Sequence, residues 1–254
     1  MIAESLIVIF VALAIGSLVK GISGLGLPLV AIPVMAGYME VERAVAIMVL
    51  PGVMLNFWLL WTYRAHAVGI ACLPAVTLVA GLSVAFGAWI LSRAPEIYLI
   101  LFLCLWLGLY LLRILLKLWV DIPVGDGRVA QFIAVGAAGL VQGAAGISGP
   151  ILATYVHSLN LKQPQYVFAV SVYFQIFALT QLASFLWLGL INAERTFESL
   201  LACIPIAIFL PLAVWSSRFF NDKAFNFLIM LLLIVIEGRL IWRLIQHWND
   251  VGAS

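Results

Sequence analysis

Long apolar runs separated by short polar connections make up nearly the whole chain. The runs cover about residues 5–39, 44–63, 67–91, 97–119, 129–160, 166–191, 199–217 and 224–246. Most of them have the length, about 20 residues, that an α-helix needs to cross the hydrocarbon core of a bilayer. Apolar residues are continuous within a run, whereas the strands of a membrane β-barrel alternate apolar and polar residues. The pattern therefore predicts an all-α polytopic membrane protein with about eight hydrophobic segments.

The first and fifth runs are too long for a single crossing. About 35 residues of unbroken helix would measure roughly 50 Å, against a hydrocarbon core of about 30 Å. Each of these runs contains a glycine-rich break near its middle. The first break covers residues 21–33 of the first run, and the second break covers residues 143–153 of the fifth run. A run that turns back at its glycines would form a hairpin, and two such hairpins would raise the number of segments to as many as ten.

The two halves of the chain resemble each other. The matched pairs are residues 20–28 with 142–150, residues 71–74 with 202–205, Trp89 and Arg93 with Trp215 and Arg218, and Arg113 and Lys117 with Arg239 and Arg243. Because the matches keep their order, they predict a duplication, which is a recurring feature of secondary transporters. We assign residues 1–121 to the first half, 122–128 to a connecting loop and 129–254 to the second half of one integral membrane domain.

The orientation of the halves depends on the two breaks. The halves run parallel if each long run crosses once, and they are inverted if each long run turns back. The Lys and Arg residues of the loops divide almost evenly between the two sides in both layouts, so the positive-inside rule does not choose between them. We expect inverted halves, because paired broken helices that meet at mid-membrane are typical of that architecture.

Composition excludes the soluble classes of protein. The chain is 65% apolar and 9% charged, whereas a soluble domain is about half apolar and about one quarter charged. A soluble enzyme, a nucleic-acid-binding protein and a disordered chain are excluded together. Cys72, Cys104 and Cys203 lie inside apolar runs and are expected to be small buried hydrophobes. The N-terminus lacks the positive region of a signal peptide, so we expect the first segment to stay in the mature protein.

The two breaks, each with a proline followed by an apolar stretch, resemble those of the TauE/SafE family of sulfite and organosulfonate exporters. The resemblance covers nearly the whole chain and includes the Tyr63-Arg64 end of the second segment. It implies a multi-pass permease for small sulfur-containing anions. We expect the protein to lie in a plasma (inner) membrane and to work by alternating access. The second break departs from the family pattern, because it has Ser148-Gly149-Pro150 instead of a full Gly-Gly-Pro run. The alternatives are a transporter of another small anion, such as a carboxylate or sulfate, and an anion channel.

The breaks also predict an anion site on physical grounds. Glycine permits close backbone approach, and proline is well placed to open a half-helix. The N-terminus of a half-helix presents free N–H groups and the positive end of the helix dipole. The alternative role for these glycines is close helix packing. The candidate substrate-binding residues are Lys20, Gly21, Ser23, Gly24, Gly26, Pro28, Gln142, Gly143, Gly146, Ser148, Gly149 and Pro150.

Lys20 is the most informative side chain, because apolar stretches precede and follow it. A charge at mid-membrane costs at least about 2.5–3.5 kcal/mol, so it needs a partner or an aqueous cavity. No acidic residue lies near Lys20 in the sequence, and a transported anion would neutralise it. Its match in the second half, Gln142, could bind the same oxygens. The alternative is a short first segment from which Lys20 reaches the interface.

Other polar residues within the runs are of second rank. The candidates for a pathway are Asn56, Arg64, Tyr155, His157, Gln175 and Gln181. An interhelical hydrogen bond is the favoured role for Asn56, Gln175 and Gln181, and an interfacial anchor is the favoured role for Arg64. Glu237 is the one carboxylate inside an apolar run. It is either a proton-coupling acid or an interfacial residue beside Arg239 and Arg243, and we favour the interfacial position.

Motifs for enzymatic chemistry are missing from the sequence. It has no spaced His, Cys and carboxylate cluster for a metal, no Walker-type loop and no Gly-x-Ser-x-Gly elbow. We therefore expect no enzyme activity, no metal and no cofactor, and we expect transport to be driven by an ion gradient or by the substrate's own gradient. The expected partners are a small anion, the lipid bilayer and, as candidate coupling ions, protons. A membrane enzyme and an assembly factor are the remaining alternatives.

Overall fold

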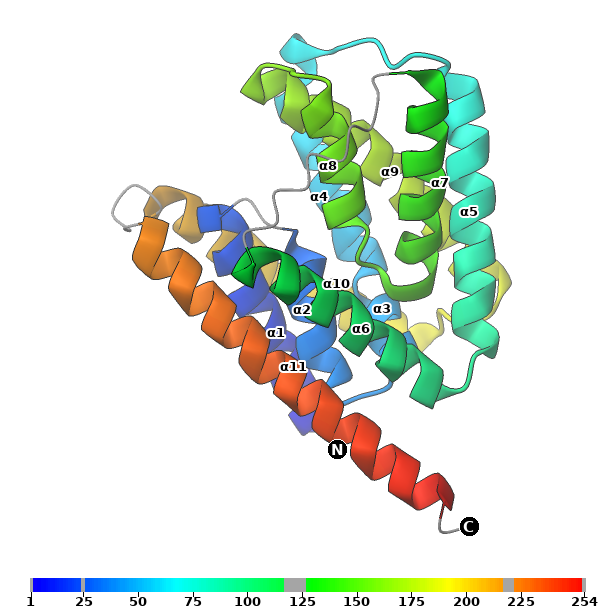
Figure 1. Cartoon of the computed structure of the whole chain (residues 1–254), viewed down its shortest axis with the longest axis vertical. Helices are drawn as coiled ribbons and strands as arrows, with labels where there is room; N and C mark the ends of the chain where they lie inside the picture. Colours follow the sequence, from blue (N-terminus) through cyan, green and yellow to red (C-terminus); the bar gives the residue numbers. More distant parts are fainter. Residues whose placement is uncertain (1, 24–25, 117–126, 217–221, 253–254) are drawn as a thin grey trace. The chain divides into compact units, whose positions relative to one another are not determined.

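All elements of the described part of the chain are helices (Figure 1). The computed structural model describes residues 2–23, 26–116, 127–216 and 222–252, so most of the predicted connecting loop lies outside the described residues. The helices are α1 (Ile2–Ser23), α2 (Leu27–Ala36), α3 (Val41–Ile47), α4 (Val49–Thr62), η1 (Arg64–His66), α5 (Leu73–Arg93), α6 (Glu96–Leu115), α7 (Arg128–Ala145), α8 (Gly149–Ser158), α9 (Gln163–Trp187), α10 (Ala193–Ser216) and α11 (Asp222–Gly252).

Seven stretches among the described residues are long and apolar enough to cross a membrane. They are Glu4–Gly21, Val41–Thr62, Leu73–Arg93, Glu96–Leu115, Arg128–Ala145, Gln163–Trp187 and Ala193–Ser216. Large apolar side chains also point outward on these helices: Ile7, Leu82 and Leu109 are each more than 60% exposed. Such a surface is stable in lipid and not in water. The prediction of an all-α membrane protein is confirmed.

Both long apolar runs fold back at their glycine-rich breaks. In the first run, a Cβ added at Gly16 of α1 would lie 3.1 Å from the carbonyl oxygen of Leu27 and 3.3 Å from the Cβ of Ala31. Since α2 begins at Leu27, this short helix returns along α1. In the second run, Ser148 at the start of α8 donates a hydrogen bond to Gln142 of α7, and α8 packs back along α7.

The helices group into two compact units. One unit holds α1, α2, α6, α11 and the second part of α10, and the other holds α4, α5, α7, α8 and α9. The core of the second unit consists of side chains from α5, α7, α8 and α9, and its largest fully buried members are Tyr173 and Phe177. Each unit therefore combines helices from both sequence halves.

Helices α5 and α7 of the second unit lie side by side (Figure 1) and approach each other at glycines. A Cβ added at Gly143 of α7 would overlap the carbonyl oxygen of Val84, and one added at Gly87 of α5 would overlap the carbonyl oxygen of Leu140. Near the start of both helices, the amide Nε2 of Gln131 donates to the carbonyl oxygen of Ala71 at 3.2 Å. The two helices therefore run in the same direction with their backbones in contact.

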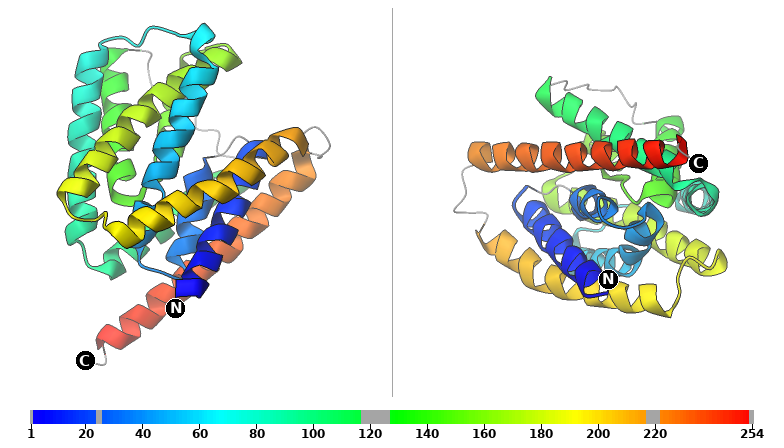
Figure 2. Two further views of the ribbon diagram at one scale, coloured as in Figure 1. Left: turned by 180° about the vertical axis from the view of Figure 1, so that it is seen from behind. Right: turned by 90° about the horizontal axis from the view of Figure 1, so that it is seen from below.

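In the other unit, α1 packs in a similar way against the second part of α10 (Figure 2). A Cβ added at Gly21 of α1 would lie 3.1 Å from the carbonyl oxygen of Leu210 and 3.0 Å from the amide nitrogen of Val214, and it would overlap the Cβ of Ala213. Only glycine at position 21 allows this approach.

The contacts of Gly21 correspond to those of Gly143. The shift that places Trp89 onto Trp215 also places Leu210, Ala213 and Val214 onto Val84, Gly87 and Ala88, which are the residues that a Cβ at Gly143 would meet. Matched sequence positions thus make matched contacts. This correspondence supports the predicted duplication, which stays a prediction, as does the inverted orientation.

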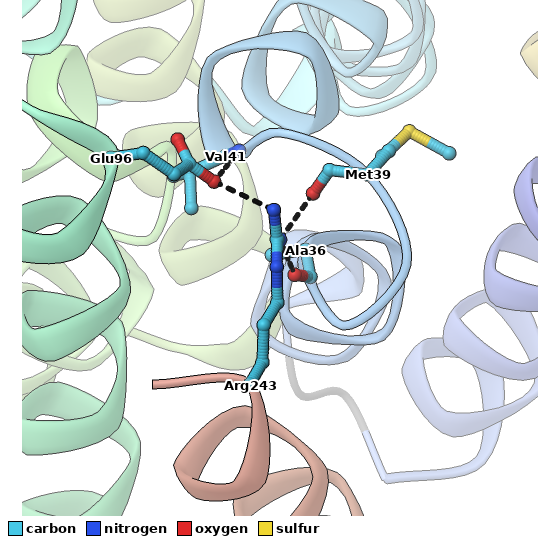
Figure 3. A network of polar contacts seen from close by, with 5 residues as sticks. All are labelled: Ala36, Met39, Val41, Glu96 and Arg243. Atoms are coloured by element: carbon cyan, nitrogen blue, oxygen red, sulfur yellow. Dashed lines mark hydrogen bonds and ion pairs between the residues drawn. The ribbon is translucent and has the colours of Figure 1, made fainter. Parts of the chain in front are cut away.

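An ion pair and three backbone contacts hold the turn between α2 and α3 (Figure 3). Arg243 of α11 donates to the carbonyl oxygens of Ala36 and Met39 and pairs with Glu96 at 3.0 Å. The same carboxyl oxygen of Glu96 accepts a hydrogen bond from the amide of Val41, the first residue of α3. Arg243 therefore satisfies carbonyl groups at the end of α2, and Glu96 caps α3.

Candidate functional site

The second break is a tight turn with a defined backbone. Gly146 ends α7 in the left-handed conformation (φ 72°), and its N–H donates to the carbonyl oxygen of Gln142 at 2.9 Å. Gly146 fits this position because a side chain in the left-handed region is strained. Ser148 is the N-cap residue of α8, and Gly149 and Pro150 follow as its first two residues.

Two glutamines and a serine fix this turn. The hydroxyl of Ser148 donates to Oε1 of Gln142 at 2.6 Å, and Nε2 of Gln142 donates to Oε1 of Gln181 at 2.9 Å. In return, Nε2 of Gln181 donates to the carbonyl oxygen of Gln142 at 2.9 Å. Gln181 of α9 thus makes the predicted interhelical hydrogen bond. Because an amide nitrogen carries two hydrogens, each glutamine retains one N–H for another acceptor.

The first break is described on both of its sides. Lys20 and Gly21 lie in the last turns of α1, and Gly26 is the N-cap residue of α2, which has Pro28 as its second residue. The predicted site residue Gly24 lies outside the described residues. Ser23 is the last residue of α1.

Lys20 is partly buried in α1. It makes no hydrogen bond or ion pair with another residue in the described part of the chain. One turn earlier, the hydroxyl of Ser17 is fully buried and has no described partner. The sequence search missed Ser17, because serine is common in membrane helices and only its burial without a partner singles it out.

The short helices that follow the breaks have uncapped N-termini. Neither Gly26 of α2 nor Ser148 of α8 makes a side-chain capping bond. The amides of Leu29 and Ile151 donate to the carbonyl oxygens of Gly26 and Ser148 in the first turn. Proline at the second position has no N–H. Within the described residues, the free N–H groups are therefore those at the first positions of the two helices.

Asn56, Arg64 and Gln175 differ in their contacts. The amide of Asn56 donates to the carbonyl oxygen of Gly52 within α4, so it makes an intrahelical bond instead of the favoured interhelical one. Arg64 is exposed, its guanidinium carbon lies 4.5 Å from the centre of the Trp61 ring, and it donates to the carbonyl oxygen of Trp61. The Oε1 atom of Gln175 is buried without a partner among the described residues.

Tyr155 and His157 lie on α8 but in different surroundings. Tyr155 is buried, and its ring contacts that of Tyr173 edge-on, with centroids 6.3 Å apart. The Tyr173 hydroxyl accepts a hydrogen bond from Gln131 at 2.9 Å. The sequence search missed Gln131, because a polar residue three positions after Arg128 resembles a segment end.

His157 is exposed and lines an open depression of about 380 Å³ together with Asn160, Leu161, Gln163 and Tyr166. Its ring meets that of Tyr166 edge-on, with centroids 6.5 Å apart. Groups of three or more His, Cys, Asp or Glu side chains that could hold a metal are absent from the described residues.

The seven long apolar stretches of the described residues indicate an integral membrane protein. A family model described as "Sulfite exporter TauE/SafE" matches residues 8–240 of the chain. The chain belongs to this family, whose members are membrane exporters or permeases of sulfite and related sulfur compounds. The resemblance predicted from the breaks is confirmed. No match was found among the curated proteins or among the solved structures.

Proposed function

We propose that this protein is a secondary transporter of small sulfur-containing anions, such as sulfite or organosulfonates, in a plasma (inner) membrane. The family match over residues 8–240 carries the proposal. A transporter needs no catalytic groups, so we assign no enzyme activity, metal or cofactor to the chain. A gradient of a coupling ion, or of the anion itself, supplies the driving force.

In this proposal each break attracts an anion within its own compact unit. The first N–H group of α2 in one unit, and that of α8 in the other, lies at the positive end of its helix dipole. Lys20 supplies a positive charge, and it has no described partner that would neutralise it. The remaining amide N–H groups of Gln142 and Gln181 supply further donors. Sulfite and sulfonate groups present three oxygens that can accept such bonds.

Alternating access is the proposed mechanism. Paired broken helices are typical of carriers that work by alternating access. The hydrogen bonds among Gln142, Ser148 and Gln181 keep the second break in one shape. Such a preformed turn binds an anion without ordering loose groups at that moment.

The test is transport by the purified protein in proteoliposomes. Labelled sulfite, an organosulfonate, sulfate and a carboxylate are offered to the wild type and to the Lys20→Ala and Gln142→Ala variants. We expect uptake and counterflow of a sulfur-containing anion. Lys20→Ala should reduce transport by about tenfold to a hundredfold, because it removes one charge-assisted hydrogen bond. Gln142→Ala should reduce transport less, since the hydrogen bonds of a neutral amide are weaker.

Lys162→Ala serves as the matched control, because Lys162 is exposed at the N-cap of α9. It should transport like the wild type. Transport of a carboxylate or sulfate alone would contradict the proposed substrate class. Conduction without counterflow would identify an anion channel instead. Wild-type rates in a correctly inserted Lys20→Ala variant would contradict the proposed role of Lys20.

A further inference from the structure

Glu237 is a carboxylate in the middle of the apolar helix α11 that the proposed anion site does not use. The side chain is partly buried, and its Oε2 atom is fully buried without a hydrogen-bond partner among the described residues. A buried carboxyl oxygen without a partner is costly, and intramembrane acids therefore tend to have a function.

The carboxyl group lies in the interface between α11 and α6. A Cβ added at Gly108 of α6 would lie 3.4 Å from Oε1 of Glu237, so the glycine leaves room for the carboxylate. Cys104 lies one turn earlier on α6. The buried residues of α11 on either side, Leu233 and Leu240, are apolar.

The cations next to Glu237 in the sequence are engaged elsewhere. Arg239 lies 4.8 Å from the ring of Tyr38, and Arg243 pairs with Glu96. The two arginines that suggested a headgroup region therefore do not neutralise Glu237.

Few other titratable groups face Glu237 from the helices packed on α11. These helices are α6, α2 and α1. Besides Cys104, α6 carries Glu96, which pairs with Arg243, and Tyr98, Tyr110 and Arg113, none of which has a hydrogen bond or ion pair with Glu237 in the described part of the chain. Helix α2 has no titratable side chain. Helix α1 carries Glu4 and Lys20, and neither forms an ion pair with Glu237 in the described part of the chain. Glu237 therefore lacks the fixed cation that a permanently ionised carboxylate would need.

Packing does not require an acid at this position. The sequence match that pairs Arg113 with Arg239 also pairs Leu111 with Glu237, and Leu111 is a buried apolar residue on α6. A leucine would fill the same kind of helix interface without the cost of a carboxylate. A carboxylate occurs at this matched position only in the second half. Since packing alone does not require it, we interpret Glu237 as a functional residue.

We propose that Glu237 is the site where the coupling proton binds and leaves during transport, an inference that rests on the proposed function. A proton from water on one side forms an O–H bond with the carboxylate at Oε2 and gives the neutral acid. On the other side this O–H bond breaks, the proton returns to water, and the carboxylate is restored. No electron is transferred, and the anion and the proton are moved in the same cycle.

The surroundings of Glu237 select a proton over a metal cation. A hard cation such as sodium or calcium needs several oxygen ligands. In the described part of the chain the carboxyl group approaches Gly108, and its Oε2 atom has no hydrogen-bond partner. A proton needs only the carboxyl oxygen itself.

The experiment compares the wild type with Glu237→Gln, which resembles the protonated acid in shape and charge. Proteoliposomes contain a pH-sensitive dye and receive a labelled anion that the wild type transports. For the wild type we expect accumulation driven by a pH gradient and a proton flux that accompanies the anion. For Glu237→Gln we expect loss of both, while anion exchange at equal pH persists. Glu194→Gln, which changes an exposed carboxylate at the start of α10, should behave like the wild type.

Several outcomes would overturn the proposal. They are pH-driven accumulation in Glu237→Gln at the wild-type level, anion transport by the wild type without proton flux, and accumulation driven by a sodium gradient alone. If Glu237→Gln does not insert, Glu237→Asp is used, because it retains the acid and should shift the pH dependence of transport. An unshifted profile would contradict the role of Glu237.

A second measurement separates this proposal from the proposed function. Infrared difference spectra of the purified protein, recorded during a pH titration, detect the carbonyl band of a protonated carboxyl group. We expect one such band in the wild type and its loss in Glu237→Gln, even if none of the tested sulfur anions is transported. If transport occurs but the band is the same in both proteins, the proton site is wrong and the transporter proposal stands.

Discussion

At the scale of single residues, Gly143 illustrates how closely helices pack in this protein. A side chain at this position would overlap the backbone of α5 at Val84 and Gly87, and backbone atoms cannot move aside without shifting a whole helix. Small residues at such positions allow the close contact on which helix association in lipid depends, because the hydrophobic effect provides no driving force there.

We therefore predict that Gly143→Ala lowers the free energy of unfolding by about 1–3 kcal/mol, as overpacking does in other protein interiors. Thermal melting in detergent measures this change. Gly52→Ala is the matched control, since Gly52 lies within α4 and no atom lies within 4 Å of an added Cβ. That variant should be neutral or slightly stabilised. Equal melting temperatures for the two variants would contradict the predicted overlap.

The sequence predicted some roles of individual residues and not others. The turn at Gly146 follows from glycine and proline, which act through the local backbone and are readable from a single segment. The partners of Gln142 and the intrahelical bond of Asn56 depend on rotamers and on neighbouring helices, which no local pattern specifies. The partners of Arg239 and Arg243 were missed for the same reason, because they depend on where each long side chain points.

At the scale of elements, Arg243 joins α11 to the end of α2, the start of α3 and the start of α6. From sequence, Arg243 matched Lys117 and had the pattern of a segment-end cation. Its actual partners are carbonyl groups that the end of a short re-entrant helix leaves unpaired. A helix of 10 residues gains little stability by itself, so such tertiary contacts maintain it.

Removing the Arg243 side chain should therefore destabilise the protein more than removing the Glu96 side chain. Arg243→Ala removes the donor that two carbonyl oxygens and the Glu96 carboxylate share. We therefore expect the free energy of unfolding to fall by about 3 kcal/mol. Glu96→Ala leaves Arg243 bonded to both carbonyl oxygens. We therefore expect the free energy of unfolding to fall by only about 1–2 kcal/mol. Thermal melting measures both losses, and hydrogen exchange at residues 37–40 locates them.

Arg239→Ala is the control for Arg243→Ala, because Arg239 lies over the ring of Tyr38 and beside Gly37 and has no ion pair in the described part of the chain. Arg239→Ala should lower the free energy of unfolding by less than about 1 kcal/mol, which is the size of an exposed cation–π contact. A larger loss for Glu96→Ala than for Arg243→Ala would show that the ion pair, and not the carbonyl contacts, holds the turn.

At the scale of the whole molecule, each sequence half supplies one side of both glycine contacts. Gly21 of the first half packs on Ala213 of the second, and Gly143 of the second half packs on Val84 of the first. The sequence predicted that two halves exist, since matched residues are visible along the chain. It did not predict that the helices group across the halves, because this grouping depends on contacts between residues far apart in the chain.

We predict that neither half is stable alone. Expression of residues 1–121 or of residues 122–254 by itself should yield a degraded or aggregated product, and co-expression of the two pieces should restore the protein and its transport. Co-purification of a tagged half with its untagged partner measures the association. We expect Gly143→Ala in the second piece to weaken co-purification, and Gly52→Ala in the first piece to leave it unchanged. A monomeric, well-folded half would contradict the prediction.

The exchanged packing of Gly21 and Gly143 also bears on how such a chain can arise. If the halves descend from one duplicated gene, the ancestral product could bury its glycine face only against a second copy of itself, so it functioned as a dimer before the genes fused. Inverted halves would further require that the ancestral protein inserted into the membrane in both directions. In both predicted layouts the Lys and Arg residues of the loops divide almost evenly between the two sides, as expected for the descendant of such an ancestor.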